Sequence, residues 1–288
     1  MRTWRRRTDP PLSPRDVVVL SAGGNRGAVQ VGMLQVLIER NIQPVGYVGC
    51  SVGALNAAFM ATGTSIDRTA ELGEYWRSLR TEDVFPGGNL TRLRNLVRRR
   101  AFLHSPDGLR TMIARWAPAE RLEDLPIPLR VVTTRLDTGD TVEHGSGPLE
   151  PLLLASAALP AIFPPVWLPD GDDATHPHVD GGVAAMVPVS AAAALQPTRV
   201  FVLDASVPVR VGRMRNPLEV LVASLGAATR SHGHENLGPG VEVHRLTCPD
   251  LGVRLLDFSK TEEHIALGRL VTHELLDELA GNGRVHAA

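Results

Sequence analysis

Residues 16–61 contain two short apolar runs that each end at a glycine turn, and this arrangement constrains the fold more than any other feature. The first run, at 16–20 (DVVVL), is rich in β-branched residues and stops at the turn 21–27 (SAGGNRG). This is typical of a buried strand and its loop. Apolar residues then recur at helical spacing over 28–40, which predicts a helix.

The second run, at 45–48, leads directly into GCSVG at 49–53 and then into a helix of small residues at 54–61. Two strands joined by a crossover helix pair in parallel, so the segment predicts a βαβ unit with a second helix attached. If the two strands are neighbours, they end side by side about 4.8 Å apart, and the two glycine turns then face each other.

The remaining sequence continues the alternation of strands and helices. A strand is predicted at 129–133, and two strands, at 131–134 and 141–143, are predicted on either side of the turn 137–140; the first two ranges overlap. Another strand is predicted at 200–203 and a last helix at 261–279. The alternation indicates an α/β protein, organised as one domain with an insertion. Further expectations are a flexible basic tail at 1–15, a helical insertion or cap at 65–128 and a C-terminal tail at 281–288.

The composition excludes several classes of protein and partner. Of the 288 residues, 43% are hydrophobic and 21% charged, which excludes a disordered, collagen-like or coiled-coil chain. The net charge of −1 gives no electrostatic reason to bind nucleic acid. Because Cys50 and Cys248 cannot form a disulfide framework and residues 1–16 lack the apolar core of a secretory signal, we expect a cytoplasmic protein.

Residues 151–168 carry no formal charge and reach the lower limit of membrane-spanning length. Prolines interrupt this stretch at 151, 160, 164 and 165, and a continuous spanning helix does not tolerate them. The segment is therefore interpreted as a buried irregular segment, and no transmembrane helix is predicted.

The pattern GxSxG at 49–53 carries Ser51 at the point where the second strand turns into a helix. This context is typical of a nucleophile elbow, in which a strained turn lifts a serine hydroxyl above the sheet. Gly49 and Gly53 are needed there, since a side chain at either position would collide with the neighbouring strand or helix. An incidental turn is the alternative. Cys50 is interpreted as a small buried packing residue.

The first glycine turn offers backbone N–H groups close to the predicted position of Ser51. Exposed amides at Gly23 and Gly24, next to a helix start, are suited to bind the oxyanion that forms when Ser51 attacks an ester. Arg26 either holds this loop in shape or neutralises a phosphate group.

Ser51 needs a base, because an isolated serine hydroxyl is a weak nucleophile. Asp180 in the DGG turn at 180–182 is one candidate, although an ordinary Asp-Gly turn fits the same residues. A Ser, Asp, His order can also be assembled with Asp250 or Asp257 and with His264 or His273. Both histidines fall in the predicted last helix, where a solvated face explains them more simply.

Three other kinds of site fit the sequence poorly. A dinucleotide site would need glycine in place of Ala22 and an acidic residue near Val48. A P-loop is excluded, because the only lysine, Lys260, is far away in the sequence. Metal-like histidine spacing occurs in His176, His178 and Asp180, and in His232 and His234. It lacks a fuller ligand set, and Pro177 and the two glycines after Asp180 predict a loop at the first of these positions.

In order, GGNRG at 23–27, GxSxG at 49–53 and DGG at 180–182 resemble the motifs of the patatin-like phospholipases. Three further stretches are also similar to that family: LNA at 55–57, ASAALPAIFPPV at 155–166 and DFS at 257–259. The resemblance covers about residues 16–280 and implies a three-layer fold with a mainly parallel central sheet and helices on both faces. The family usually has one more glycine before Gly23, where this chain has Ala22.

The resemblance also implies a chemistry. In such proteins the elbow serine and the DGG aspartate form a catalytic dyad without histidine, here Ser51 and Asp180. The glycine-rich loop forms the oxyanion hole, here Gly23, Gly24, Asn25, Arg26 and Gly27. The implied activity is that of a lipolytic acyl hydrolase that cleaves esters of phospholipids, lysophospholipids or acylglycerols without a metal or organic cofactor.

Two other functions stay open: acyl transfer through the same acyl-enzyme, and lipid binding without catalysis. The arginines in 92–100, with no acidic residue among them, predict either contact with anionic lipid headgroups at a membrane surface or a solvated helix face. We expect a lipid ester as the partner and no nucleic acid.

Overall fold

The computed structural model describes residues 14–85, 102–169, 174–206, 217–230, 237–247, 249, 252 and 257–285. Several sequence predictions lie outside these ranges: most of the tail at 1–15, the arginines in 92–100, His232, His234, Cys248 and Asp250.

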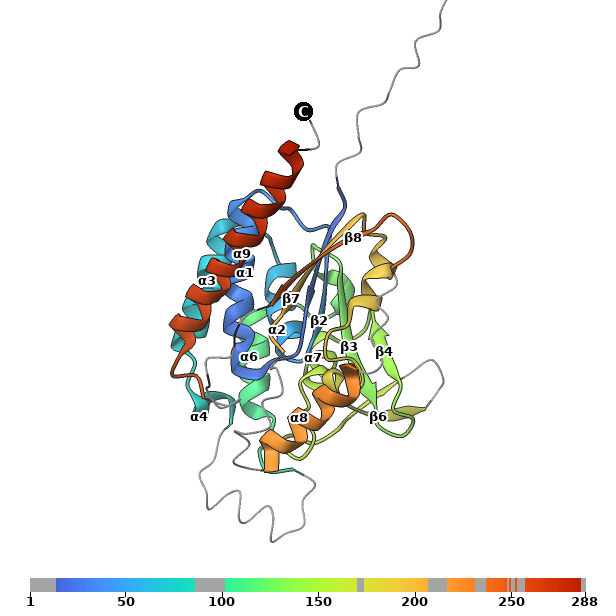
Figure 1. The fold of residues 1–288 in the computed structure, drawn as a ribbon. Coiled ribbons are helices and arrows are strands. Elements are labelled where there is room, and N and C mark those ends of the chain that lie inside the picture. The colour runs from blue at the N-terminus through green and yellow to red at the C-terminus, as the bar shows by residue number, and fades with distance from the viewer. Residues whose placement is uncertain are drawn as a thin grey trace, which may run out of the picture.

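Within these ranges, eight strands form one sheet (Figure 1). They are β1 Asp16–Leu20, β2 Gly46–Cys50, β3 Leu129–Arg135, β4 Thr141–His144, β5 Val166–Pro169, β6 Thr175–Asp180, β7 Arg199–Asp204 and β8 Glu242–Thr247. Their order is β5-β6-β3-β2-β1-β7-β8, and β4 pairs with β3 outside this path. The centre is parallel, from β3 through β2, β1 and β7 to β8, whereas β4, β5 and β6 add antiparallel pairs.

The described helices are α1 Gly27–Glu39, α2 Val52–Ala61, α3 Ile66–Ser78, α4 Thr81–Val84, α6 Asp107–Trp116, α7 Leu149–Ser156, α8 Pro217–Arg230 and α9 Thr261–Val285. Short 3-10 turns are η1 Gly24–Arg26, η2 Leu122–Asp124, η3 Gly181–Val183 and η4 Val189–Leu195. Because α1 joins the neighbouring parallel strands β1 and β2, the predicted βαβ unit is confirmed. Leu20 lies beside Gly49 in this pairing, so the two glycine turns leave the sheet side by side.

The strand β1 is buried on both faces of the sheet. Val18 and Leu20 pack into a core shared with α1, α2, α3, α6 and α7, while Val17 and Val19 pack on the opposite side against η4. A strand covered on both faces is a continuous apolar run rather than an alternating one, which explains the sequence DVVVL. The α/β fold with a mainly parallel sheet is confirmed.

The region 65–128, expected as a helical insertion or cap, contributes α3, α4, α6 and η2 where it is described. Trp76 on α3 and Trp116 on α6 are buried in the same core as α1 and α2, and their rings lie 6.1 Å apart. These helices are therefore part of the main core rather than a separate layer.

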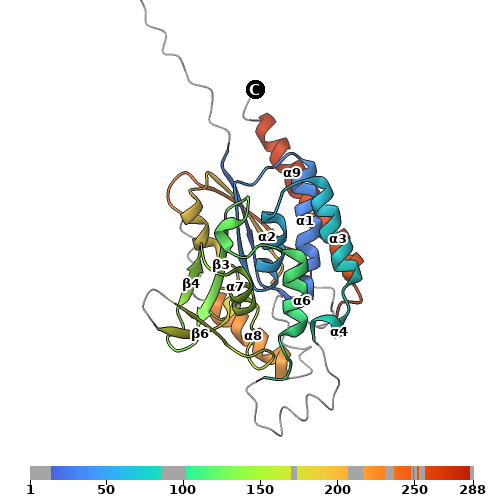
Figure 2. The same ribbon diagram turned by 180° about the vertical axis from the view of Figure 1, so that it is seen from behind.

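The last helix, α9, lies along α1 in both views of the molecule (Figures 1 and 2). A Cβ atom added to Gly32 of α1 would lie 2.0 Å from the Ile265 carbonyl oxygen, and one added to Gly268 would lie 2.0 Å from the Val29 carbonyl oxygen. The two helix backbones touch because both glycines lack a side chain. α9 continues to Val285, past its predicted end at residue 279, so it includes most of the predicted tail at 281–288.

Two loop predictions are wrong. Residues 151–168 contain most of α7 and the start of β5; the irregular part is limited to the stretch between them, and Pro151 lies in the first turn of α7, where proline is tolerated. His176, Pro177 and His178 lie in β6 rather than in a loop, and the Pro177 carbonyl accepts a hydrogen bond from the Leu136 amide. No described helix is long and apolar enough to cross a membrane.

Candidate active site

The elbow between β2 and α2 holds Ser51 with φ 55° and ψ −130°. A positive φ is unusual for a residue with a side chain and marks a strained turn. A Cβ atom on Gly49 would lie 2.5 Å from the Ala54 Cα atom, and one on Gly53 would lie 2.4 Å from the Leu20 carbonyl oxygen. Both glycines are thus required sterically, and Gly53 brings the start of α2 into contact with the end of β1.

The Ser51 hydroxyl donates a hydrogen bond to Asp180 Oδ2 at 2.6 Å, although the two residues are 129 positions apart in the sequence. Asp180 ends β6 and pairs with Thr133 of β3, while Cys50 pairs with Val132 of the same strand. β3 therefore lies between the two strands and brings their ends together.

The carboxylate of Asp180 lies in a largely dry environment, since the residue is only 4% exposed. Oδ1 accepts a hydrogen bond from the Gly182 amide at 2.8 Å, and Oδ2 accepts the one from Ser51. Burial raises the pKa of Asp180 from 3.8 to about 6, and the hydrogen bonds from Ser51 and Gly182 oppose part of the rise. Such a group is ionised at neutral pH and still basic enough to accept a proton.

The DGG turn is held from several sides. The Asp180 amide donates to the Ala158 carbonyl at 3.0 Å, and the Thr134 hydroxyl donates to the Asp180 carbonyl at 3.0 Å. A Cβ atom on Gly181 would lie 2.3 Å from the Val132 carbonyl oxygen, so this position needs glycine. The orientation of the Asp180 side chain is fixed by these backbone contacts.

The glycine loop lies on the other side of Ser51. Gly24 has φ 58°, in the left-handed region that favours glycine, and a Cβ atom on Gly23 would lie 2.8 Å from the Ala205 carbonyl oxygen. Within the described ranges, the amides of Gly23 and Gly24 donate to no other residue. They lie at the start of η1, which leads directly into the N-terminus of α1, and a helix N-terminus favours negative charge. Ala22 is accommodated, and its amide donates to the Met186 carbonyl at 2.9 Å.

The side chains of Asn25 and Arg26 are buried and hold the loop from inside. Asn25 Nδ2 donates to the Asp257 carbonyl at 2.6 Å, and Arg26 Nε donates to the Ala205 carbonyl at 3.1 Å. Of the two roles predicted for Arg26, these contacts fit the shaping of the loop.

Ser156 is a site residue that sequence reasoning missed. It is fully buried at the end of α7, its hydroxyl accepts a hydrogen bond from the Ser51 amide at 3.0 Å, and it donates to the Val132 carbonyl at 2.7 Å. The contact supports the backbone at the strained residue. Its only sequence signal is its position in the run ASAALPAIFPPV, which does not say which side chain faces Ser51.

The two candidate histidines do not reach Ser51. Within the described residues, neither Ser51 nor Asp180 has a hydrogen bond to a histidine. His264 is 2% exposed, so the predicted solvated face is wrong for this residue, whereas His273 contacts Arg40. The Cys50 thiol is buried, and both burial and the charge of Asp180 raise its pKa, which keeps it protonated.

The described histidines of the metal-like pattern, His176 and His178, have separate partners. His176 contacts Arg135 and Asp137, His178 shares the Thr133 hydroxyl with His144, and Asp180 faces Ser51. Among the described residues, no group of three or more His, Cys, Asp or Glu side chains is arranged to hold a metal ion.

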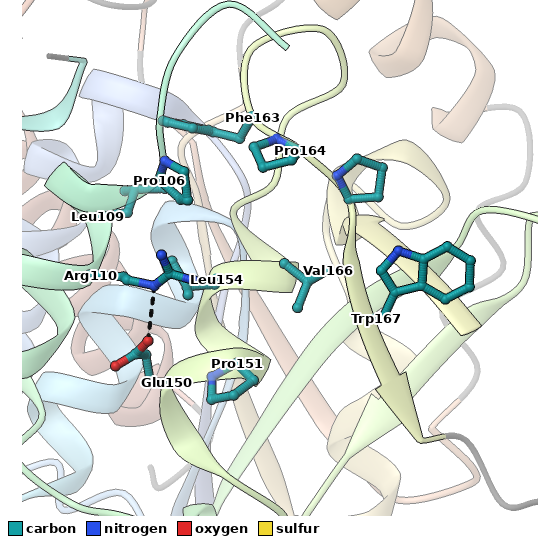
Figure 3. A pocket seen from close by; sticks show the side chains of 11 residues that line it. Pro106, Leu109, Arg110, Glu150, Pro151, Leu154, Phe163, Pro164, Val166 and Trp167 are labelled. Carbon is teal, nitrogen blue, oxygen red and sulfur yellow. Dashed lines mark hydrogen bonds and ion pairs between the residues drawn. The ribbon is translucent and has the colours of Figure 1, made fainter. Parts of the chain in front are cut away.

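A pocket of about 340 Å³ lies between α6, α7 and β5 (Figure 3). Leu109, Leu154, Phe163 and Val166 are among its apolar lining residues, and Trp167 lies at its edge. Arg110 Nε donates to Glu150 at 3.2 Å beside it. Most of the lining belongs to the run 151–168, and the rest is Glu150 together with three residues of the region 65–128.

Comparison with known proteins gives consistent results. A family profile described as "Patatin-like phospholipase" matches residues 18–193. An uncharacterized NTE family protein of Mycobacterium tuberculosis is 30% identical over 181 residues, which cover 62% of this chain and 45% of that protein. Patatin-like phospholipase domain-containing protein 6 of Homo sapiens is 30% identical over 190 residues, covering 65% of this chain and 13% of that protein.

The chain thus spans less than half of the length of these curated relatives. Among solved structures, VipD from Legionella pneumophila matches with a TM-score of 0.49 and 16% sequence identity, over 92% of this chain and 67% of that chain.

Proposed function

The chain belongs to the patatin-like phospholipase family, and from this premise we propose that it hydrolyses lipid esters with Ser51 as nucleophile and Asp180 as general base. The observation that carries the proposal is the hydrogen bond of 2.6 Å from the Ser51 hydroxyl to Asp180 Oδ2. A nucleophile and its base within hydrogen-bond reach are the signature of an activated serine.

The first half of the reaction forms an acyl-enzyme. As Ser51 Oγ attacks the ester carbonyl carbon, its proton passes to Asp180, and the carbonyl oxygen becomes an oxyanion. The Gly23 and Gly24 amides stabilise that charge. When the intermediate collapses, the bond to the alcohol breaks and Asp180 returns the proton to the leaving oxygen.

The second half releases the acid. Water loses a proton to Asp180 as it attacks the acyl carbon, and the proton then returns to Ser51 Oγ when the ester bond to the enzyme breaks. One carboxylate serves both halves if the leaving alcohol and the incoming water approach from the same side of the acyl group. These steps need no histidine and no metal.

The pocket beside α7 is the proposed site for the apolar part of the substrate. Its walls are aliphatic and aromatic, and the same helix supports Ser51 through Ser156. Leu154→Trp, which fills the pocket, should lower kcat/KM for long-chain esters more than for acetate or butyrate esters. An equal loss for all chain lengths would contradict this assignment.

The proposal is tested by labelling the purified protein with a fluorophosphonate probe and locating the adduct by peptide mass spectrometry. Release of fatty acid from phospholipid and lysophospholipid vesicles is measured in parallel. We expect an adduct on Ser51 that disappears in Ser51→Ala and falls at least about a hundredfold in rate in Asp180→Asn. Asp137→Asn, which changes an exposed carboxylate, should label like the wild type.

Two outcomes would contradict the proposal. Full esterase activity in Ser51→Ala would exclude Ser51 as the nucleophile. Folded wild-type protein that neither forms an adduct nor releases fatty acid, yet binds the vesicles, would indicate a lipid-binding protein instead. Glycerol or lysolipid added to an active sample separates hydrolysis from acyl transfer, because transfer yields a new ester.

A further inference from the structure

Three buried side chains from three helices form a chain of hydrogen bonds behind the candidate site. Trp76 Nε1 donates to Asn56 Oδ1 at 2.8 Å, and Asn56 Nδ2 donates to Gln30 Oε1 at 3.0 Å. All three residues are essentially inaccessible to solvent. The sequence analysis named none of them as a site residue, and Asn56 appeared there only as part of the stretch LNA at 55–57.

The direction of this chain is fixed at one end. An indole N–H can only donate, so Trp76 forces the carbonyl oxygen of Asn56 to face it. The amide nitrogen of Asn56 then faces Gln30 Oε1 and the Gly27 carbonyl, both at 3.0 Å. Gln30 must in turn point its own amide nitrogen away from Asn56. Turning either amide over would place two donors or two acceptors against each other.

The far end of the chain reaches the glycine loop. Gln30 Nε2 donates to the Ser21 carbonyl at 2.9 Å and to the Leu203 carbonyl at 3.2 Å. Ser21 and Gly27 flank the segment that carries the Gly23 and Gly24 amides. Asn56 lies on α2, the helix that begins directly after Ser51. The chain therefore connects both ends of the loop to the helix of the nucleophile.

We propose that Gln30 and Asn56, oriented by Trp76, are positioning residues that set the distance and direction of the loop amides relative to Ser51. The inference rests on the proposed function, because its consequence is the stabilisation of the oxyanion. Donors in an oxyanion site act through their placement before the reaction begins, and small displacements reduce the rate strongly. A fully satisfied buried network holds such a placement, while a broken one leaves unpaired groups.

The test compares two glutamines on α1. Gln30→Met keeps the size of the side chain but removes the amide that donates to the Ser21 carbonyl of the loop and to the Leu203 carbonyl of β7. Gln35→Met is the matched control, since Gln35 is also buried and bonds instead to Thr69 and Arg269, away from the loop. Trp76→Phe keeps an aromatic ring but removes the fixed donor. Thermal unfolding of each variant shows that it is folded.

We measure kcat and KM with a soluble ester, together with the inhibition constant of an alkyl trifluoromethyl ketone, whose adduct with a serine carries the same oxyanion. Gln30→Met should lower kcat about ten- to a hundredfold and raise the inhibition constant of the ketone by a similar factor, with little change in KM. Trp76→Phe should act in the same direction, and the double variant should lose no more than Gln30→Met alone. Gln35→Met should keep the wild-type kcat, whatever its effect on stability.

If the wild-type protein forms the adduct on Ser51, equal kcat values for Gln30→Met and Gln35→Met would overturn this inference alone. A loss of kcat in Gln30→Met without weaker binding of the ketone would also overturn it. If the folded wild type forms no adduct on Ser51, the proposed function fails and this inference fails with it.

Discussion

At the scale of single residues, Asp180 combines two properties that work against each other. Its carboxylate is removed from water, which disfavours the ionised form, yet the proposed chemistry needs that form. Only the hydroxyl of Ser51 and the amide of Gly182 donate to its oxygens in the described structure. The result is a pKa of about 6, within reach of ordinary pH titrations.

The rate of Ser51 acylation should therefore follow the ionisation of Asp180. We expect the labelling rate with a neutral fluorophosphonate to rise with pH, reach half of its maximum near pH 6 and level off above pH 7. Circular dichroism at each pH serves as the control for folding. A rate that does not change between pH 4.5 and 8 would contradict the assignment of Asp180 as the base.

The same pKa predicts a change in stability. The folded state holds the Asp180 proton more tightly than the unfolded state, where the pKa is about 3.9, so stability falls as pH rises from about 4 to about 6. The Asp180→Asn variant has no carboxyl group to titrate at this position, so this loss of stability is absent from it. The variant should gain up to about 3 kcal/mol relative to the wild type between pH 4 and pH 8. Urea unfolding at both pH values measures the difference, and a variant that loses stability relative to the wild type over that interval would contradict the prediction.

At the scale of elements, the elbow depends on the close approach of α2 to the end of β1. Gly53→Ala would place a methyl group 2.4 Å from the Leu20 carbonyl and 2.5 Å from the Ser21 carbonyl, so strand and helix must separate. We expect at least about a tenfold loss of kcat and a destabilisation of about 2 kcal/mol. Gly63→Ala, with no atom within 4 Å of the added methyl group, should leave both quantities near the wild-type values.

The elements whose sequence pattern is local were predictable, and those defined by distant pairing were not. β1 and α1 follow from an apolar run and from helical spacing within the same residues. β6 could not be predicted, because Pro177 and the following glycines indicate a loop and its partner β3 is distant in sequence. In the same way, the sequence motifs identify Ser51 and Asp180 as candidates, but they do not predict the contact between them, which depends on β3 lying between β2 and β6. The sequence around Ser156 and Gln30 does not say what these side chains face, since only the folded backbone shows it.

At the scale of the whole molecule, the fold needs segments beyond the part that the family profile matches, which ends at residue 193. β7 pairs with every residue of β1, and α9 packs directly on the backbone of α1. A chain ended at residue 193 should therefore show no cooperative thermal unfolding by circular dichroism. A chain ended at residue 285, which keeps α9, should unfold like the full chain. A cooperative transition in the shorter chain would contradict this account.

The strained backbone at Ser51 also has an evolutionary consequence. Glycine at this position would relax the positive φ, and asparagine in place of Asp180 would remove a buried charge. Selection for stability alone would thus replace both residues, each by a change that abolishes the proposed chemistry. A descendant released from that chemistry should drift toward a more stable, inactive protein.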